Sequence, residues 1–161
     1  MVDTFEAVFE AQHTRLLRIA GLLTGDSVLA EEVVAEAFAK VFGRWRRGRI
    51  DDVGAYLRRA VINEVNGLYR KRGRALAVTA LDGDASPDPW RRVDDRDALA
   101  RALGRLNPLQ RAVLVLRYFD DLSVADTARV LDVPVGTVKS SVARGLERLR
   151  PLLIEEDPDR A

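Results

Sequence analysis

Helical periodicity in two blocks, with an aperiodic stretch between them, is the feature that most constrains the fold of this chain. Apolar residues recur every three or four positions across 5–68 and again across 98–153, which is typical of amphipathic α-helices. The stretch between them contains prolines, a glycine and many aspartates, a composition typical of a linker. The pattern predicts an all-α chain of two small helical domains joined by a flexible linker. The predicted division is 1–75, linker 76–94, 95–154 and a polar tail 155–161.

Capping residues divide the first block into three helices. Asp3 followed by Glu6 resembles a capping box, and Gly25 is placed to end the first helix. Asp26 is a good N-cap for the second helix, which runs to about residue 45. The aspartate pair at 51–52 opens the third. These signals predict a three-helix domain with one shared core.

The second block contains a short segment with the proportions of a helix-turn-helix. Asn107 followed by proline begins a helix that is expected to reach about residue 119. Ser123 then caps a short helix, and Asp132 suits a tight turn because aspartate tolerates left-handed backbone angles. The last helix is expected over about 135–153. A plain helical hairpin within a bundle is the alternative, but the cap, the turn and an outward polar set together favour helix-turn-helix.

Charge is distributed in blocks, although the net charge is only +1. Residues 44–74 carry ten basic and three acidic side chains, and residues 101–150 carry nine and five. Phosphate backbones respond to local potential, because salt screens charges beyond about 8 to 10 Å. The two basic blocks therefore favour nucleic acid as the partner, with solvated basic faces as the alternative.

Composition excludes several kinds of chemistry. The chain has no cysteine and one histidine, His13, which argues against thiol nucleophiles, iron-sulfur clusters and zinc sites. No catalytic residues, cofactor or metal are predicted, and the protein is not expected to be an enzyme. Its N-terminus is acidic and its apolar runs are short, so we expect no membrane insertion and a cytoplasmic location.

Four segments carry a resemblance to a known family. LSVADTARVLDVPVGTVKSSVARGLERLR resembles region four of bacterial sigma factors of the extracytoplasmic-function group, and LNPLQRAVLVLRYFDDLS resembles the helix before it. AEEVVAEAFAKVFGRW is similar to the core-binding helix of region two, and GAYLRRAVINEVNGLYRKRGR to the helix that melts and reads the minus-ten element. The resemblance implies a transcription initiation factor that binds core RNA polymerase, through the β′ clamp and the β flap, and promoter DNA. An anti-sigma factor is a further candidate partner.

The resemblance also implies which residues act. Asn63 falls where the family receives a flipped minus-ten base, and Tyr56 stands where many members have tryptophan; a partly buried ring and a solvated amide are the alternative interpretation. The other DNA-binding candidates are Arg59, Arg70, Lys71, Arg72, Arg74, Thr137, Lys139, Ser140, Ser141, Arg144 and Arg148. The polymerase-binding candidates are Glu32, Glu36, Phe38, Val41 and Phe42. Ala35, Gly67 and Ser141 depart from the family pattern, and Ser141 suggests an altered minus-thirty-five preference.

Two other classes of protein share part of this pattern. A dimeric repressor also uses a helix-turn-helix, but it needs one reading head per subunit, whereas this chain has two basic blocks. A metal-dependent hydrolase would use carboxylates, but those of this chain lie mostly at helix starts, in the linker and in the tail. Capping and solubility explain carboxylates at such positions.

Overall fold

The computed structural model describes residues 4–71 and 98–156, with side chains as far as 68 in the first range and 153 in the second. Every regular element in these two ranges is a helix. The helices are α1 (Phe5–Thr24), α2 (Ser27–Trp45), α3 (Val53–Lys71), α4 (Ala98–Gly104), α5 (Pro108–Leu114), the π-helical η2 (Val115–Phe119), α6 (Val124–Leu131) and α7 (Val135–Glu156). The predicted linker 76–94 lies outside the described residues, as does the predicted tail 155–161 except for residues 155 and 156, which are the end of α7.

Helices α1, α2 and α3 form an N-terminal bundle around an apolar core. Side chains from all three helices are at most 2% exposed: Leu16, Ile19, Leu22, Val34, Val41, Leu57, Val61 and Ile62. Complete burial of an aliphatic side chain of this size stabilises a fold by about 1.5 to 3 kcal/mol. The outer faces of α2 and α3 are therefore held on a rigid support.

The caps of the N-terminal bundle follow the sequence signals with one exception. Asp26 accepts from two first-turn N–H groups of α2 at 2.9 and 3.2 Å. Gly25 ends α1 with a φ of 68°, and Asp52 accepts from the N–H three residues on at 3.1 Å. The predicted capping box at Asp3 is wrong, because the N-cap of α1 is Thr4, whose hydroxyl accepts from the Ala7 N–H at 3.2 Å.

Helices α4 to α7 form a C-terminal bundle, in which α7 packs against α4, α5 and α6. Asn107 caps α5 by accepting from the Gln110 N–H at 2.8 Å, as predicted. The expected single helix to 119 changes at Val115 into the π-helix η2. Its wider turn is closed by the Asp120 N–H, which donates to the Val115 carbonyl at 3.2 Å. Single π-turns of this kind change the direction in which the following side chains point, and they are frequent at functional sites.

The segment from Ser123 to α7 is a helix-turn-helix, as predicted. Ser123 accepts from the Asp126 N–H at 3.0 Å and so caps α6. Asp132 ends α6 in the left-handed region, with φ 55° and ψ 50°. The Val133 N–H donates to the Ala128 carbonyl at 3.0 Å and closes the turn. These local bonds set the angle at which α7 leaves α6.

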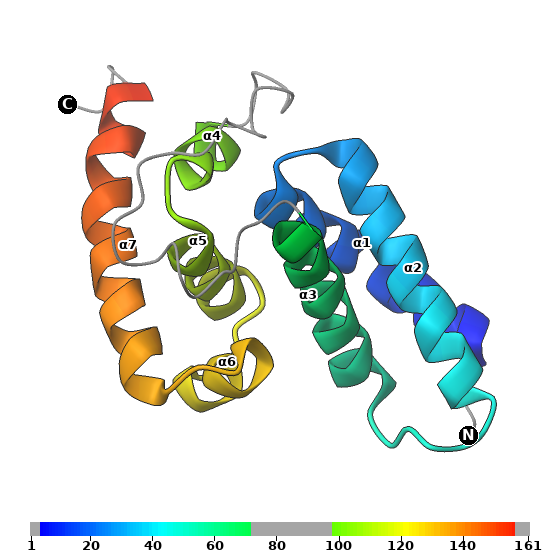
Figure 1. Cartoon of the computed structure of the whole chain (residues 1–161). Helices are drawn as coiled ribbons and strands as arrows, with labels where there is room; N and C mark the ends of the chain where they lie inside the picture. The colour runs from blue at the N-terminus through cyan, green and yellow to red at the C-terminus, as the bar shows by residue number, and fades with distance from the viewer. Residues whose placement is uncertain (1–3, 72–97, 157–161) are drawn as a thin grey trace.

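The two bundles pack against each other (Figure 1), α1 beside α5 and η2, and α3 beside α6. Arg111 of α5 is 4% exposed and its guanidinium donates to the Leu23 carbonyl of α1 at 3.1 Å. The same group donates to three carbonyls of its own bundle, those of Leu103, Gly104 and Leu106. A cation is favourable there because helix C-terminal carbonyls carry partial negative charge.

A second contact between the bundles centres on Asp120, directly after η2. Its side chain is wholly buried and forms ion pairs with Arg15 of α1, at 2.6 Å, and with Arg58 of α3. Arg15 also donates to the Asp120 backbone carbonyl at 3.2 Å. Nearby, the Arg18 guanidinium lies 6.0 Å from the centre of the Phe119 ring. These contacts join residues more than 60 positions apart. None of the sequence patterns described above predicts contacts between the two bundles.

Candidate nucleic-acid interface

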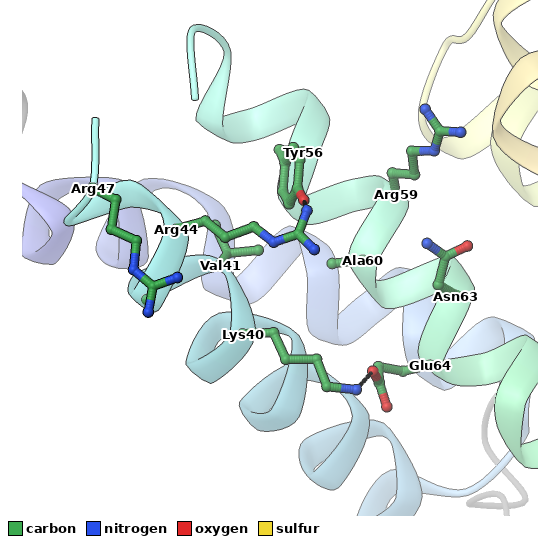
Figure 2. A pocket seen from close by; sticks show the side chains of 10 residues that line it. Lys40, Val41, Arg44, Arg47, Tyr56, Arg59, Ala60, Asn63 and Glu64 are labelled. Carbon is green, nitrogen blue, oxygen red and sulfur yellow. Dashed lines mark hydrogen bonds and ion pairs between the residues drawn. The ribbon is translucent and has the colours of Figure 1, made fainter. Parts of the chain in front are cut away.

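An open groove of about 810 Å³ lies between α2 and α3 (Figure 2). Its lining residues are Lys40, Val41, Gly43, Arg44 and Arg47 of α2, and Tyr56, Arg59, Ala60, Asn63 and Glu64 of α3. The structure thus brings together Tyr56, Arg59 and Asn63, three of the residues that the sequence assigned to DNA binding. The spacing of these three places them on one side of α3, and α2 supplies the opposite wall.

Arg44 orients the aromatic ring of the groove. Its Nη1 donates to the Tyr56 hydroxyl oxygen, and its guanidinium carbon lies 5.6 Å from the centre of the Tyr56 ring. Figure 2 shows Arg44 reaching from α2 to the end of the Tyr56 side chain on α3. Because the phenol oxygen accepts from Arg44, its own O–H remains available as a donor.

Lys40 and Glu64 close the other end of the groove as an ion pair, drawn as a dashed line in Figure 2. Lys40 also lies 3.8 Å from a carboxylate oxygen of Glu36, one turn earlier on α2. The hydrogen bond with Glu64 raises the pKa of Lys40 above its ordinary value. Lys40 therefore stays protonated throughout the physiological range and ties α2 to α3.

The lining of the groove suits an unpaired nucleic-acid strand. The guanidiniums of Arg44 and Arg47 belong to the α2 wall and that of Arg59 to the α3 wall, and guanidinium is the side-chain group best matched to phosphate oxygens. Tyr56 offers a ring on which a base can stack. Asn63 is exposed, and its amide can both donate to and accept from the Watson–Crick edge of an extruded base.

The second candidate surface is the outer side of α7. Lys139, Ser140, Arg144 and Arg148 are exposed, and Thr137 is half-buried. The Ser140 hydroxyl donates to the Thr137 carbonyl at 3.2 Å, within the helix. In a helix-turn-helix the second helix enters the major groove with such a face. These five predicted residues lie on one helix, and four of them are exposed.

Ser141 was expected to point outward, and that prediction is wrong. Its exposed fraction is 8%, because it lies three residues after Val138, which is fully buried, and on the same side of α7. Gly145 lies on the same side of α7, one turn after Ser141. A Cβ added to Gly145 would lie 3.0 Å from Leu114 Cδ1 of α5. Small residues along this line let α7 approach α5 closely.

The predicted polymerase-binding residues of α2 divide into two groups. Glu32 and Glu36 are exposed, and Phe42 is 40% exposed. Phe38 is only 5% exposed and Val41 is fully buried. The prediction that these two residues contact polymerase directly disagrees with their burial in the core, since the apolar stripe of α2 that the sequence shows faces α1 and α3. Their part is to hold the exposed residues in position.

An aromatic cluster adjoins Phe42, and its α1 rings belong to the apolar stripe that predicts the shared core. The Phe5 ring centre lies 4.8 Å from that of Phe42, and the Phe9 ring centre lies 4.8 Å from that of Phe38. Phe9 is 39% exposed. The periodic pattern shows that α1 has an apolar stripe, but it does not show where that stripe extends beyond the edge of the neighbouring helix.

Four predicted DNA-binding residues follow the groove along the chain. Arg70 and Lys71 belong to the last turn of α3, but their side chains lie outside the described part of the structure, and Arg72 and Arg74 lie outside it altogether. Among the described residues, no group of three or more His, Cys, Asp or Glu side chains has the arrangement of a metal site. None of the helices described has the length and apolar character needed to cross a membrane.

Comparison with known proteins identifies the family of both bundles. Residues 8–75 match the family model Sigma-70 region 2, and residues 96–149 match Sigma-70, region 4. The RNA polymerase sigma-E factor of Streptomyces coelicolor is 36% identical over 159 residues, which cover 96% of this chain and 89% of that protein. The ECF RNA polymerase sigma factor SigM of Mycobacterium tuberculosis is 36% identical over 152 residues, covering 92% and 76%.

One solved structure is similar over nearly the whole chain. It is the sigma factor RpoE of Bartonella quintana in complex with the anti-sigma factor NepR, with a TM-score of 0.73 and 25% identity, covering 94% of this chain and 98% of that one. A likeness of this extent includes both bundles.

Two helical DNA-binding bundles with these matches define a bacterial transcription initiation factor of the sigma-70 family, and the chain belongs to that family. Within it, the protein is an extracytoplasmic-function sigma factor. The N-terminal bundle is region 2, which binds the minus-ten element, and the C-terminal bundle is region 4, which binds the minus-thirty-five element. Proteins of this family direct RNA polymerase to promoters and are not enzymes.

Proposed function

We propose that the groove between α2 and α3 is where this sigma factor receives the unpaired minus-ten strand. Tyr56 stacks on a base, Asn63 pairs with the edge of an extruded base, and the guanidinium of Arg59 holds phosphate, together with the basic residues Arg70, Lys71, Arg72 and Arg74. The observation that carries the proposal is the convergence of Tyr56 and Asn63 with three arginines on one open groove. Arg44 adds the orientation of the Tyr56 ring.

The outer side of α7 reads the minus-thirty-five duplex in this proposal. Ser140 is short enough to let the helix approach base edges, and Arg144 can reach a base or a phosphate. Thr137, Lys139 and Arg148 contact the backbone. Ser141 acts indirectly, because its burial against the rest of region 4 sets the depth of α7 rather than a contact with DNA.

The partners divide between the two regions. Region 2 docks on the β′ clamp of RNA polymerase through Glu32, Glu36 and Phe42, supported from beneath by Phe38 and Val41, and region 4 docks on the β flap. The similarity to a sigma factor solved with NepR supports an anti-sigma factor as a further partner. The functional units are 1–75 and 95–154.

Paired promoter templates test the division of labour. Tyr56→Ala and Asn63→Ala should leave closed-complex binding by the holoenzyme nearly intact and reduce strand opening, and a template with a pre-melted bubble at the minus-ten element should restore transcription. Arg144→Ala should weaken recruitment by about 1 to 3 kcal/mol and should not be rescued by the bubble.

Tyr118→Ala is the matched control, because that exposed tyrosine lies outside the groove. It should show no defect that a bubble corrects. Equal rescue of the Arg144 and Tyr56 variants, or rescue of neither, would show that the assignment of strand opening to the groove is wrong.

A further inference from the structure

The Asp120 carboxylate of region 4 occupies a two-arginine cradle on region 2. Arg15 Nη2 lies 2.6 Å from one carboxylate oxygen, and Arg58 Nε pairs with the other. The Asp120 side chain is wholly buried, while the side chains of Arg15 and Arg58 remain 48% and 20% exposed. The cradle therefore belongs to region 2, and region 4 supplies only the anion.

One arginine of the cradle, Arg58, lies on α3, the helix that carries the minus-ten residues, and the other, Arg15, lies on α1. Arg58 directly precedes Arg59 and lies two residues after Tyr56 on α3. A carboxylate and a phosphate diester present similar pairs of oxygens to guanidinium, which binds both with charge-assisted hydrogen bonds. Two guanidiniums that converge on one anion, on the region that reads the minus-ten DNA, form a site that also suits a backbone phosphate.

Promoter binding separates the two bundles. The minus-ten and minus-thirty-five elements are about 25 base pairs apart, or roughly 85 Å at about 3.4 Å per base pair. The longest helices of each region have 20 and 22 residues, which at about 1.5 Å per residue span only about 30 Å. Regions in direct contact through Asp120 cannot reach both elements of a straight duplex at once. Engagement of both elements therefore withdraws Asp120 and uncovers Arg15 and Arg58.

We propose that Arg15 and Arg58 form a phosphate site for the promoter strand, and that Asp120 fills it as an intramolecular phosphate mimic while the chain is closed. The proposal rests on the proposed function in one respect, namely that α3 faces the minus-ten DNA. It adds two cations that no sequence signal singled out and explains why a carboxylate from region 4 is buried against region 2. Opening the chain exchanges one anion for another at the same arginines.

Salt dependence of holoenzyme binding to a promoter fragment tests the phosphate site. Each phosphate contact contributes about 0.7 to 0.9 to the slope of log affinity against log salt. Arg58→Gln should reduce the magnitude of this slope by that amount. Between about 50 and 200 mM salt, the affinity of the variant should then fall by a factor about threefold smaller than that of the unaltered protein. Arg58→Lys keeps the charge and should retain the slope. Arg105→Gln, an exposed cation of region 4, is the matched control and should leave it unchanged.

The closed state is tested in the free full-length chain. Because the chain has no cysteine, Glu31→Cys and Glu147→Cys introduce two labelling positions, one on each region, for energy transfer. Asp120→Asn should lower the transfer, and in the holoenzyme it should leave the salt slope unchanged because Asp120 has by then left the site.

An unaltered slope in Arg58→Gln, or unaltered transfer in Asp120→Asn, would overturn the proposal. Neither result would change the expected rescue of the Tyr56 and Asn63 variants by a pre-melted bubble. Failure of the proposed phosphate site can therefore be distinguished from failure of the proposed function of the groove.

Discussion

Replacing Gly145 by alanine tests whether close contact between α7 and α5 positions the DNA-reading helix. The added Cβ would lie 3.0 Å from Leu114 Cδ1 and 3.3 Å from Leu114 Cγ. Leu114 is 4% exposed, so it cannot swing into solvent without moving its neighbours. Overpacking of this kind costs about 1 to 3 kcal/mol, while replacing a helical glycine by alanine stabilises by about 1 kcal/mol. The net free energy of unfolding should therefore be unchanged or fall by up to about 2 kcal/mol.

Gly67→Ala is the matched control, because a Cβ there meets no described atom within 4 Å. Urea denaturation of the full chain should show that Gly67→Ala stabilises by about 1 kcal/mol. The difference between the two variants, about 1 to 3 kcal/mol, then measures the steric cost at α5 alone. If Gly145→Ala stabilises the chain as much as Gly67→Ala does, close packing does not set the position of α7.

Two further changes test the internal supports of the fold. Arg111→Met removes a buried donor to four carbonyls, of which the Leu23 carbonyl belongs to region 2, and thermal unfolding should show a loss of about 3 to 5 kcal/mol; a loss below about 1 kcal/mol would contradict its role. Asp132 has a φ of 55°, so Asp132→Val should destabilise by about 1 to 2 kcal/mol while Asp132→Gly should not. Equal denaturation midpoints for these two variants would show that the left-handed turn is not required.

The helices and their ends follow from the sequence because their causes are local. A cap such as Asp26, Asn107 or Ser123 bonds to an N–H only two or three residues away, so the residue and its immediate neighbours decide the outcome. The same holds for the left-handed turn at Asp132. The helix-turn-helix was predictable for this reason, and the order of the motifs was enough to indicate the family.

Only the tertiary structure decided which side of each apolar stripe is covered and by what. Periodicity placed Phe38 and Val41 on α2 and Ser141 on α7, but their burial depends on how close the neighbouring helices come. Asp120 follows the C-terminus of η2, where a negative charge is unfavourable because of the helix dipole. This position is the one sequence signal that Asp120 has a cationic partner elsewhere. That partner, Arg15, lies 105 residues away, and no local pattern encodes a contact at that separation, because it forms only when the two bundles meet.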